Sequence, residues 1–138
     1  MIITETISLK TSGVCDVVNI THHVEAIVSK SNIKNGNVTV FVPGSTAGVT
    51  TIEYEPGLVA DIKEAFERIA PKGIPYAHNE TWGDGNGYSH IRASLLGASL
   101  VVPFVNFKMV LGTWQQIVLI DFDNRLRKRD VVVQVMGE

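Results

Sequence analysis

Apolar and polar residues alternate in several short stretches of the chain. Ile3, Ile7 and Leu9 are separated mainly by Thr, Glu, Ser and Lys residues, which is the pattern of a half-buried β-strand. The same alternation recurs over residues 38–42, directly after the turn signal at residues 35–37. Four further segments are predicted to be strands: residues 49–52, 99–105, 113–122 and 130–136.

Two longer segments repeat apolar residues at intervals of three and four instead. The clearer one begins near Pro56, a residue suited to the first position of a helix, and its apolar residues between 58 and 69 share one face. An earlier helix is predicted to run to about Ser31, with Asn19 or Thr21 as its N-cap.

Residues 76–88 are polar, aromatic and rich in glycine, so we expect them to lack regular structure. A short helix is predicted to follow, with Ser89 as its cap and Gly97 at its end. Its apolar residues, including Ile91 and Leu95, are expected to face the core. The pattern as a whole predicts an α+β fold, with two to three helices packed on the strands.

Composition narrows the class of protein. With 138 residues, 45% hydrophobic and 19% charged, the chain is expected to form a single soluble globular domain over residues 1–138. Its formal net charge of -2 gives no bulk attraction for nucleic acid or an anionic membrane. The longest apolar run, residues 100–105, is far too short to span a bilayer.

Two local features complete this picture. Cys15 is the single cysteine, so no internal disulfide forms, and a reducing, cytoplasmic location is expected. The basic run at residues 125–129 is interpreted as a solvated turn between two strands rather than as a ligand site.

The most informative chemistry lies between His78 and His90, which bracket Asp84, Asn86 and three glycines. Imidazole and carboxylate ligands together suit a divalent ion such as zinc, and glycine allows the loop to turn sharply enough for residues twelve apart to converge. The spacing matches no standard zinc signature. The alternative is an ordered polar loop whose histidines bind backbone groups, and the residues alone leave both interpretations open.

Phosphate binding is a second hypothesis for the same region. Asn86 and Gly87 precede a helix whose first N–H groups would attract an anion, and Arg92 lies in its opening turns. Residues 44–48 form another glycine-containing loop that could bind an anion. The alternatives are ordinary turns and a solvated arginine.

Three blocks of the chain resemble the YjbQ-like family, also called the secondary thiamine-phosphate synthase family, over nearly the whole length. The first is Phe41-Val42-Pro43-Gly44-Ser45-Thr46-Ala47-Gly48-Val49, and the second runs from His78 through Asp84-Gly85-Asn86 to His90. The third, Leu111-Gly112-Thr113-Trp114-Gln115-Gln116-Ile117, is the most specific.

The resemblance implies a compact, mostly antiparallel α+β protein that assembles as a homotrimer with a pocket between subunits. It also implies a transfer reaction that joins a pyrimidine methyl pyrophosphate to a thiazole phosphate and releases pyrophosphate. His78 and His90, with Asp84 or Glu53, would then hold a divalent metal, zinc or magnesium. The residues expected to bind substrate are Asn86, Gly87, Arg92, Ser45, Thr46, Trp114 and Gln115.

One departure bears on catalysis. Many members carry His where this chain has Gly44, so one imidazole is missing here. The function predicted from the sequence is binding of a small phosphate ester, with metal-assisted transferase activity as its finer form. The alternatives are a metal-dependent hydrolase and a non-catalytic trimeric binding or scaffold protein. Neither a nucleic acid nor a membrane is an expected partner.

Overall fold

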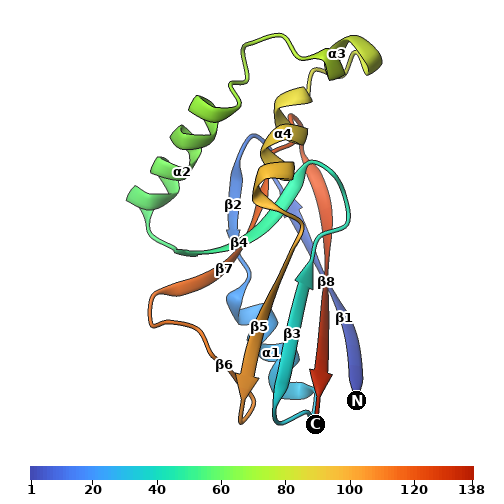
Figure 1. Ribbon diagram of the computed structural model, residues 1–138, viewed down its shortest axis with the longest axis vertical. Coiled ribbons are helices and arrows are strands. Elements are labelled where there is room, and N and C mark those ends of the chain that lie inside the picture. The colour runs from blue at the N-terminus through green and yellow to red at the C-terminus, as the bar shows by residue number, and fades with distance from the viewer.

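Two antiparallel sheets form the body of the protein, and the computed structural model describes all residues from 1 to 138. Four helices lie around these sheets (Figure 1). The five-stranded sheet has the order β1 (Ile2–Thr11), β8 (Arg127–Gly137), β3 (Gly36–Phe41), β5 (Ser99–Val105) and β6 (Lys108–Met109). The three-stranded sheet has the order β2 (Asp16–Asn19), β7 (Gln115–Asp121) and β4 (Ala47–Glu53). The predicted α+β class is confirmed.

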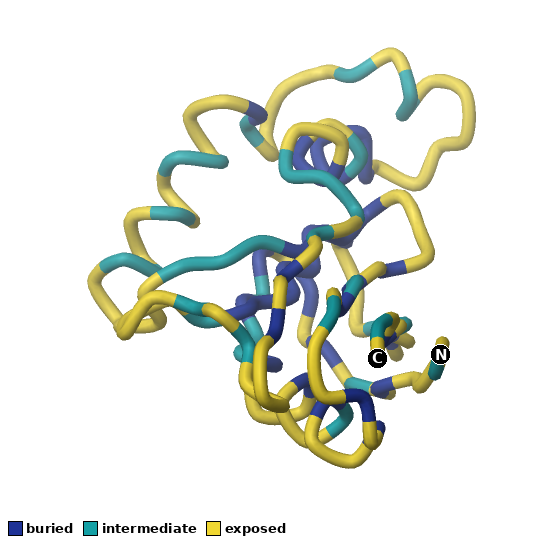
Figure 2. The backbone as a smooth tube through the Cα atoms, turned by 60° about the horizontal axis from the view of Figure 1, so that its bottom comes forward, coloured by how far each residue is buried: buried dark blue, intermediate teal, exposed yellow.

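The main core lies between the two sheets. Alternate residues of β8, such as Val131 and Val133, are fully buried, while their neighbours along the strand are more exposed. Helix α1 (Thr21–Lys30) contributes Val24 and Val28 to the same core. Figure 2 shows the buried backbone concentrated in the strands, whereas the outer helices are largely exposed or half-buried.

Strand β7 is buried on both faces, which explains its unbroken apolar run. Ile117 and Leu119 belong to the core between the sheets, whereas Val118 and Ile120 belong to a second core on the other face. Successive side chains of a strand point to opposite faces, so both faces of β7 need apolar residues. This central position fixes the end of β7, where Asp121 lies.

Helix α2 (Pro56–Ile69) begins as predicted, since Pro56 is its first residue and the Glu55 carboxylate accepts hydrogen bonds from the N–H groups of Gly57 and Leu58. None of its residues is fully buried. Phe66 packs edge-on against Phe122, with 4.7 Å between ring centroids. The helix lies along one side of the molecule (Figure 1), and its apolar residues Val59, Ile62 and Phe66 are half-buried against the second core.

The region after α2 differs from the sequence prediction. Residues 77–82, expected to be irregular, form helix α3 (Ala77–Trp82). Helix α4 (Gly87–Leu96) starts before the predicted cap at Ser89, because Asn86 occupies the N-cap position. Two short strands, β2 and β6, were also not predicted.

The inner face of α4 was predicted wrongly. Ile91 is 45% exposed and Leu95 is 61% exposed, while Ser89 and Arg92 are buried. The Ser89 hydroxyl donates to the Phe122 carbonyl, and Arg92 has partners in and after α2. Because these polar groups are hydrogen-bonded, they can occupy the inner face at little cost. None of the four helices is both long enough and apolar enough to cross a membrane.

Candidate functional site

His78 and His90 lie side by side although they come from different helices. Their rings have centroids 4.2 Å apart and are tilted by 40°. Gly83 and Gly85, both with positive φ, form the turn that brings α3 against the start of α4. The structure thus brings together the two imidazoles that bracket the glycine-rich stretch of the sequence.

Asp84 is the acidic neighbour of this pair. Its Oδ1 lies 3.6 Å from His78 Nδ1, too far for a hydrogen bond but close enough for an ion pair if the imidazole is protonated. His78 Nδ1 is buried and has no hydrogen-bond partner within the chain. A buried ring nitrogen without a partner is costly, and it is available to a ligand.

The environment of His90 favours its neutral form. Burial lowers the pKa of His90, and repulsion from His78 lowers it further, while Asp84 and Asp123 act in the opposite direction. A neutral imidazole can accept a proton or coordinate a metal ion.

Between the end of β7 and the start of β8 lies a buried ion pair that the sequence interpretation did not identify. The Asp121 carboxylate accepts from Arg129 Nε and Nη2, each at 2.8 Å, and also from the Thr11 hydroxyl. Burial by itself would raise the pKa of Asp121, but these bonds and the Asp123 N–H lower it overall. The carboxylate is therefore held in its ionised form.

Asp123 connects this ion pair to the site. Its carboxylate accepts from Arg127 at 2.7 Å and from the Thr46 hydroxyl at 3.2 Å. Asn86 Nδ2 donates to it at 3.3 Å, and with the amide turned over the same nitrogen lies 3.0 and 3.2 Å from the two Asp84 oxygens. Burial would raise the pKa of Asp123, but the hydrogen bonds and Arg127 lower it overall. Asn86 thus lies between a buried carboxylate and the carboxylate beside His78.

The interpretation of residues 125–129 as a solvated turn is wrong for two of its arginines. Arg127 and Arg129 form the ion pairs just described, and Arg129 is only 3% exposed. A signal was present in the sequence: both residues continue the alternation of Val131 and Val133, which face the core. The face of β8 that points to the core is therefore apolar over Val131 and Val133 and charged at its start, where Arg127 and Arg129 lie.

A pocket of about 240 Å³ opens beside His90, between the loop after β3 and helix α4. Ser45 lines this pocket, whereas the neighbouring Thr46 is buried and its hydroxyl belongs to the charged network. The lining residues are Gly44, Ser45, Ala47, His90, Ala93, Ser94, Gly97 and Ala98.

Two residues expected to bind phosphate are engaged elsewhere. The Gly87 N–H donates to Asn79 Oδ1 at 2.9 Å, so it is not free for a ligand. Arg92 donates from Nε to the Ala70 carbonyl at 3.1 Å and from Nη2 to Glu67 at 2.7 Å. These contacts tie α4 to the end of α2, and they direct the guanidinium of Arg92 towards α2.

The remaining predicted residues lie at the far end of the small sheet. The register pairs Ala47 with Asp121 but Glu53 with Gln115, six positions along, which is about 20 Å at 3.3 Å per residue. Trp114 is 72% exposed near the same end. Glu53 is therefore too distant to complete a metal site with the histidines of its own chain. Correspondingly, no three His, Cys, Asp or Glu side chains are assembled as a metal site in this structure.

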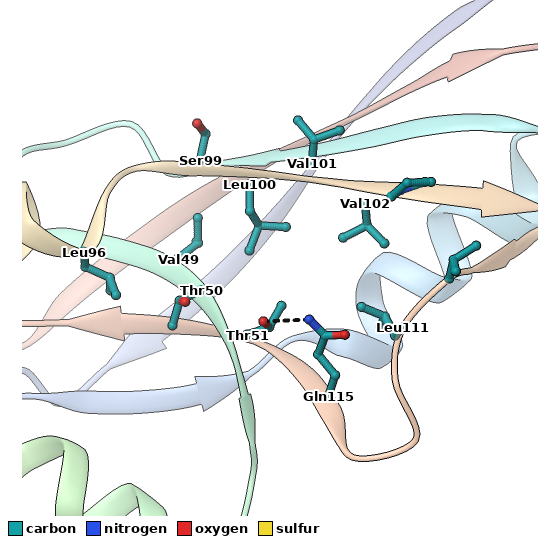
Figure 3. Close-up of a pocket in the computed structure, with 12 residues that line it drawn as sticks. Val49, Thr50, Thr51, Leu96, Ser99, Leu100, Val101, Val102, Leu111 and Gln115 are labelled. Carbon is teal, nitrogen blue, oxygen red and sulfur yellow. Dashed lines mark hydrogen bonds between the residues drawn. The ribbon is translucent and has the colours of Figure 1, made fainter.

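This far end carries a pocket of its own, of about 340 Å³ (Figure 3). Gln115 Nε2 donates to the Thr51 hydroxyl at 2.9 Å, and Gln115 Oε1 accepts from the Gly112 N–H. Leu100, Val102 and other apolar side chains line the rest of the cavity. The structure thus divides the predicted site residues between two ends of one sheet.

The protein is thus an α+β domain with a histidine pair beside a small pocket. Comparison with other proteins shows which family has this arrangement of sequence and fold. The sequence profile described as UPF0047 protein YjbQ-like matches residues 5–138, and the chain belongs to this family. It is 38% identical over 130 residues to a UPF0047 protein of Archaeoglobus fulgidus, covering 94% of this chain and 98% of that protein. It is 31% identical to UPF0047 protein YugU of Bacillus subtilis, covering 96% and 98%.

Solved structures agree with the fold. A YbjQ-like protein from Sulfolobus solfataricus superposes with a TM-score of 0.90 at 35% identity, over 100% of both chains. A YjbQ/UPF0047 family protein from Clostridium acetobutylicum gives a TM-score of 0.87 at 38% identity, covering 96% of this chain and 99% of that one.

Proposed function

We propose that this protein binds the phosphate group of a small molecule in the pocket beside His90. The observation that carries the proposal is the shared lining of this pocket by Ser45 and His90, with the unpartnered Nδ1 of His78 close behind. A hydroxyl donor and imidazole groups are suitable partners for phosphate oxygens. The volume of about 240 Å³ suits a phosphate group with a small organic moiety.

His78 and His90 would hold a divalent cation, with Asp84 as a further oxygen ligand. Two imidazoles and one carboxylate suit zinc better than magnesium, because magnesium prefers oxygen ligands. The buried, unpartnered Nδ1 of His78 fits such a role. Since one chain offers no assembled set of three ligands, Asp84 must approach from its present 3.6 Å contact with His78. When bound, the cation would supply Lewis-acid stabilisation of charge on phosphate oxygens.

The likeness to the secondary thiamine-phosphate synthase family supports a transferase role with release of pyrophosphate. In that role, Ser45 would donate a hydrogen bond to the phosphate, and the neutral His90 imidazole would hold the cation that stabilises the leaving pyrophosphate. Asp84 would either be a ligand of the cation, as above, or orient His78, from whose Nδ1 its Oδ1 lies 3.6 Å away. Asn86 would hold Asp84 through the amide orientation that places its nitrogen 3.0 Å from that carboxylate.

We further propose a homotrimer in which a second copy covers the pocket. Ile91 and Leu95 expose apolar surface on α4, the helix that carries His90, and Val101 in β5 and Trp114 before β7 are also exposed. Exposed apolar surface of this kind marks protein contacts. Such an assembly would allow Trp114 and Gln115 of a neighbouring copy to approach the histidine site.

Calorimetric titration with thiazole phosphate and with the corresponding free alcohol tests the proposal. Wild-type protein should bind the phosphate ester at least tenfold more tightly than the alcohol, the effect of about one charge-assisted contact. Ser45→Ala and His90→Ala should each remove most of that preference. Equal binding of the ester and the alcohol would contradict phosphate recognition. Binding without turnover of the ester and a pyrimidine pyrophosphate would identify a binding protein rather than a transferase.

A further inference from the structure

Arg129 uses only part of its hydrogen-bonding capacity inside the protein. Nε and Nη2 donate to Asp121, and Nη2 also donates to Thr46 Oγ1 at 2.6 Å. A guanidinium has five N–H donors, so the two on Nη1 remain without a partner. Only His78 Nδ1 and Tyr88 OH are side-chain polar atoms that are both fully buried and without a partner. Arg129 Nη1 also lacks a partner but is not among them, so it is accessible to solvent. The small exposed part of an otherwise buried side chain is thus a donor nitrogen.

Gly44 creates the opening over this nitrogen. A Cβ added at Gly44 would lie 3.2 Å from Arg129 Nη1 and would meet no other atom within 4 Å. Gly44 is exposed and lines the pocket that contains His90 and Ser45. The absence of a side chain at position 44 therefore leaves a path between the guanidinium and the pocket.

We propose that Arg129, reached through the opening at Gly44, is the positively charged group that binds the phosphate oxygens in this pocket. The inference rests on the proposed function and identifies its charged contact, which Arg92 does not supply. Two N–H groups on one nitrogen provide a charge-assisted donor of the kind that recognises phosphate.

The surrounding network prepares Arg129 for this role. Its guanidinium is held in place by Asp121 and Thr46, so binding an anion orders no mobile side chain. The buried network also contains Asp123 and Arg127, so its two carboxylates and two guanidinium groups balance. The carboxylates of Asp121 and Asp123 are therefore neutralised by their arginine partners. A phosphate that binds at Nη1 would contact a fixed donor and would not be repelled by an unpaired carboxylate.

Filling the opening without touching the ion pairs is the sharpest test. Gly44→Ala places a methyl group against Nη1, and because Gly44 has a φ of +129° it also strains the loop. Arg129→Lys removes Nη1 without changing that loop and so separates the two effects. Gly73→Ala is the control for an added methyl group, because an added Cβ there meets nothing within 4 Å and Gly73 lies outside the pocket. Inorganic phosphate, a phosphate monoester and its free alcohol serve as probes in calorimetric titrations.

Gly44→Ala should weaken binding of both phosphate probes roughly ten- to hundredfold, with Gly73→Ala within about threefold of wild type. Arg129→Lys keeps a positive charge but lacks Nη1, so in folded protein it should weaken the same probes and leave the alcohol unaffected. Comparable losses in both glycine variants, or normal phosphate binding in Gly44→Ala, would overturn the assignment. If the wild-type protein binds neither phosphate probe, both the proposed function and the role of Arg129 are refuted. If wild type binds the monoester and both Gly44→Ala and Arg129→Lys do so normally, the role of Arg129 alone is refuted.

Discussion

Asp121 and Arg129 form a two-point ion pair in the interior, with both donor–acceptor distances at 2.8 Å. Asp121 ends the central strand of the small sheet and Arg129 lies near the start of β8, so this pair joins the two sheets. It stands directly beneath the loop that carries Ser45, since Arg129 also donates to Thr46. The stability of the fold and the shape of the pocket are therefore linked through one charged contact.

The first prediction concerns the dependence of stability on pH. The folded-state pKa of Asp121 is below its ordinary value of 3.8, so its contribution is present above that value and is lost as pH falls through the folded pKa. Asp121→Asn should cost roughly 3 kcal/mol near neutral pH, because it leaves Arg129 without its charged partner. Urea denaturation should show this difference shrinking below about pH 4. A difference that stays constant from pH 7 to pH 3 would contradict this.

The second prediction separates structure from binding at Arg92. Its guanidinium ties α4 to the Ala70 carbonyl and to Glu67, so Arg92→Ala should lower the free energy of unfolding by roughly 2 kcal/mol. Phosphate affinity of the folded variant should be unchanged. Arg68→Ala, which breaks only an exposed pair with Glu64, is the control and should cost at most about 0.5 kcal/mol. A stable Arg92→Ala protein with weakened phosphate binding would show that the expectation from sequence was right.

The third prediction concerns the histidine pair. Because burial and the neighbouring His78 lower the pKa of His90, NMR titration of its ring protons should give a value below 6.5. His78→Ala removes the repulsion while the burial stays, so the pKa of His90 should rise towards 6.5 in that variant. As the pH falls below 6.5, unfolding is increasingly favoured, since the unfolded chain binds that proton more readily. An unchanged pKa in His78→Ala would mean that the two rings do not interact as the geometry indicates.

The fourth prediction concerns assembly. Light scattering should give a mass near three times 15.1 kDa at micromolar concentration. Leu95→Glu should weaken the assembly, because Leu95 exposes apolar surface on the helix that carries His90. Leu126→Glu, at an even more exposed leucine among basic residues, is the control and should leave the mass unchanged. A monomeric wild type would remove the proposed trimer.

Much of the fold follows from local patterns. The alternation at Ile3 and Ile7 predicted β1, and the start near Pro56 with its three- and four-residue spacing predicted α2. Helix α4 was predicted, but its inner face was not, because Ser89 and Arg92 find partners on segments distant in the sequence. No local pattern reveals such partners, so an apolar face was assumed instead.

The site was predictable only in part, for a similar reason. The glycines between His78 and His90 indicated that the two imidazoles could converge, and in the structure their rings lie side by side. Glu53 and Gln115 lie at the opposite end of β4 and β7, which only the strand register reveals. Arg129 was overlooked because a basic run is usually solvated, although its place in the alternation of β8 indicated an inward side chain.

The position of a bound phosphate monoester in a crystal of the wild-type protein tests the central claim most directly. Phosphorus is expected in the pocket between the loop at residues 44–47 and α4, within hydrogen-bonding reach of Ser45 and Arg129 Nη1. Cations, where added, should appear between His78 and His90. A phosphate bound instead at Arg92, or in the cavity lined by Thr51 and Gln115 with the His90 pocket unaffected, would contradict the account.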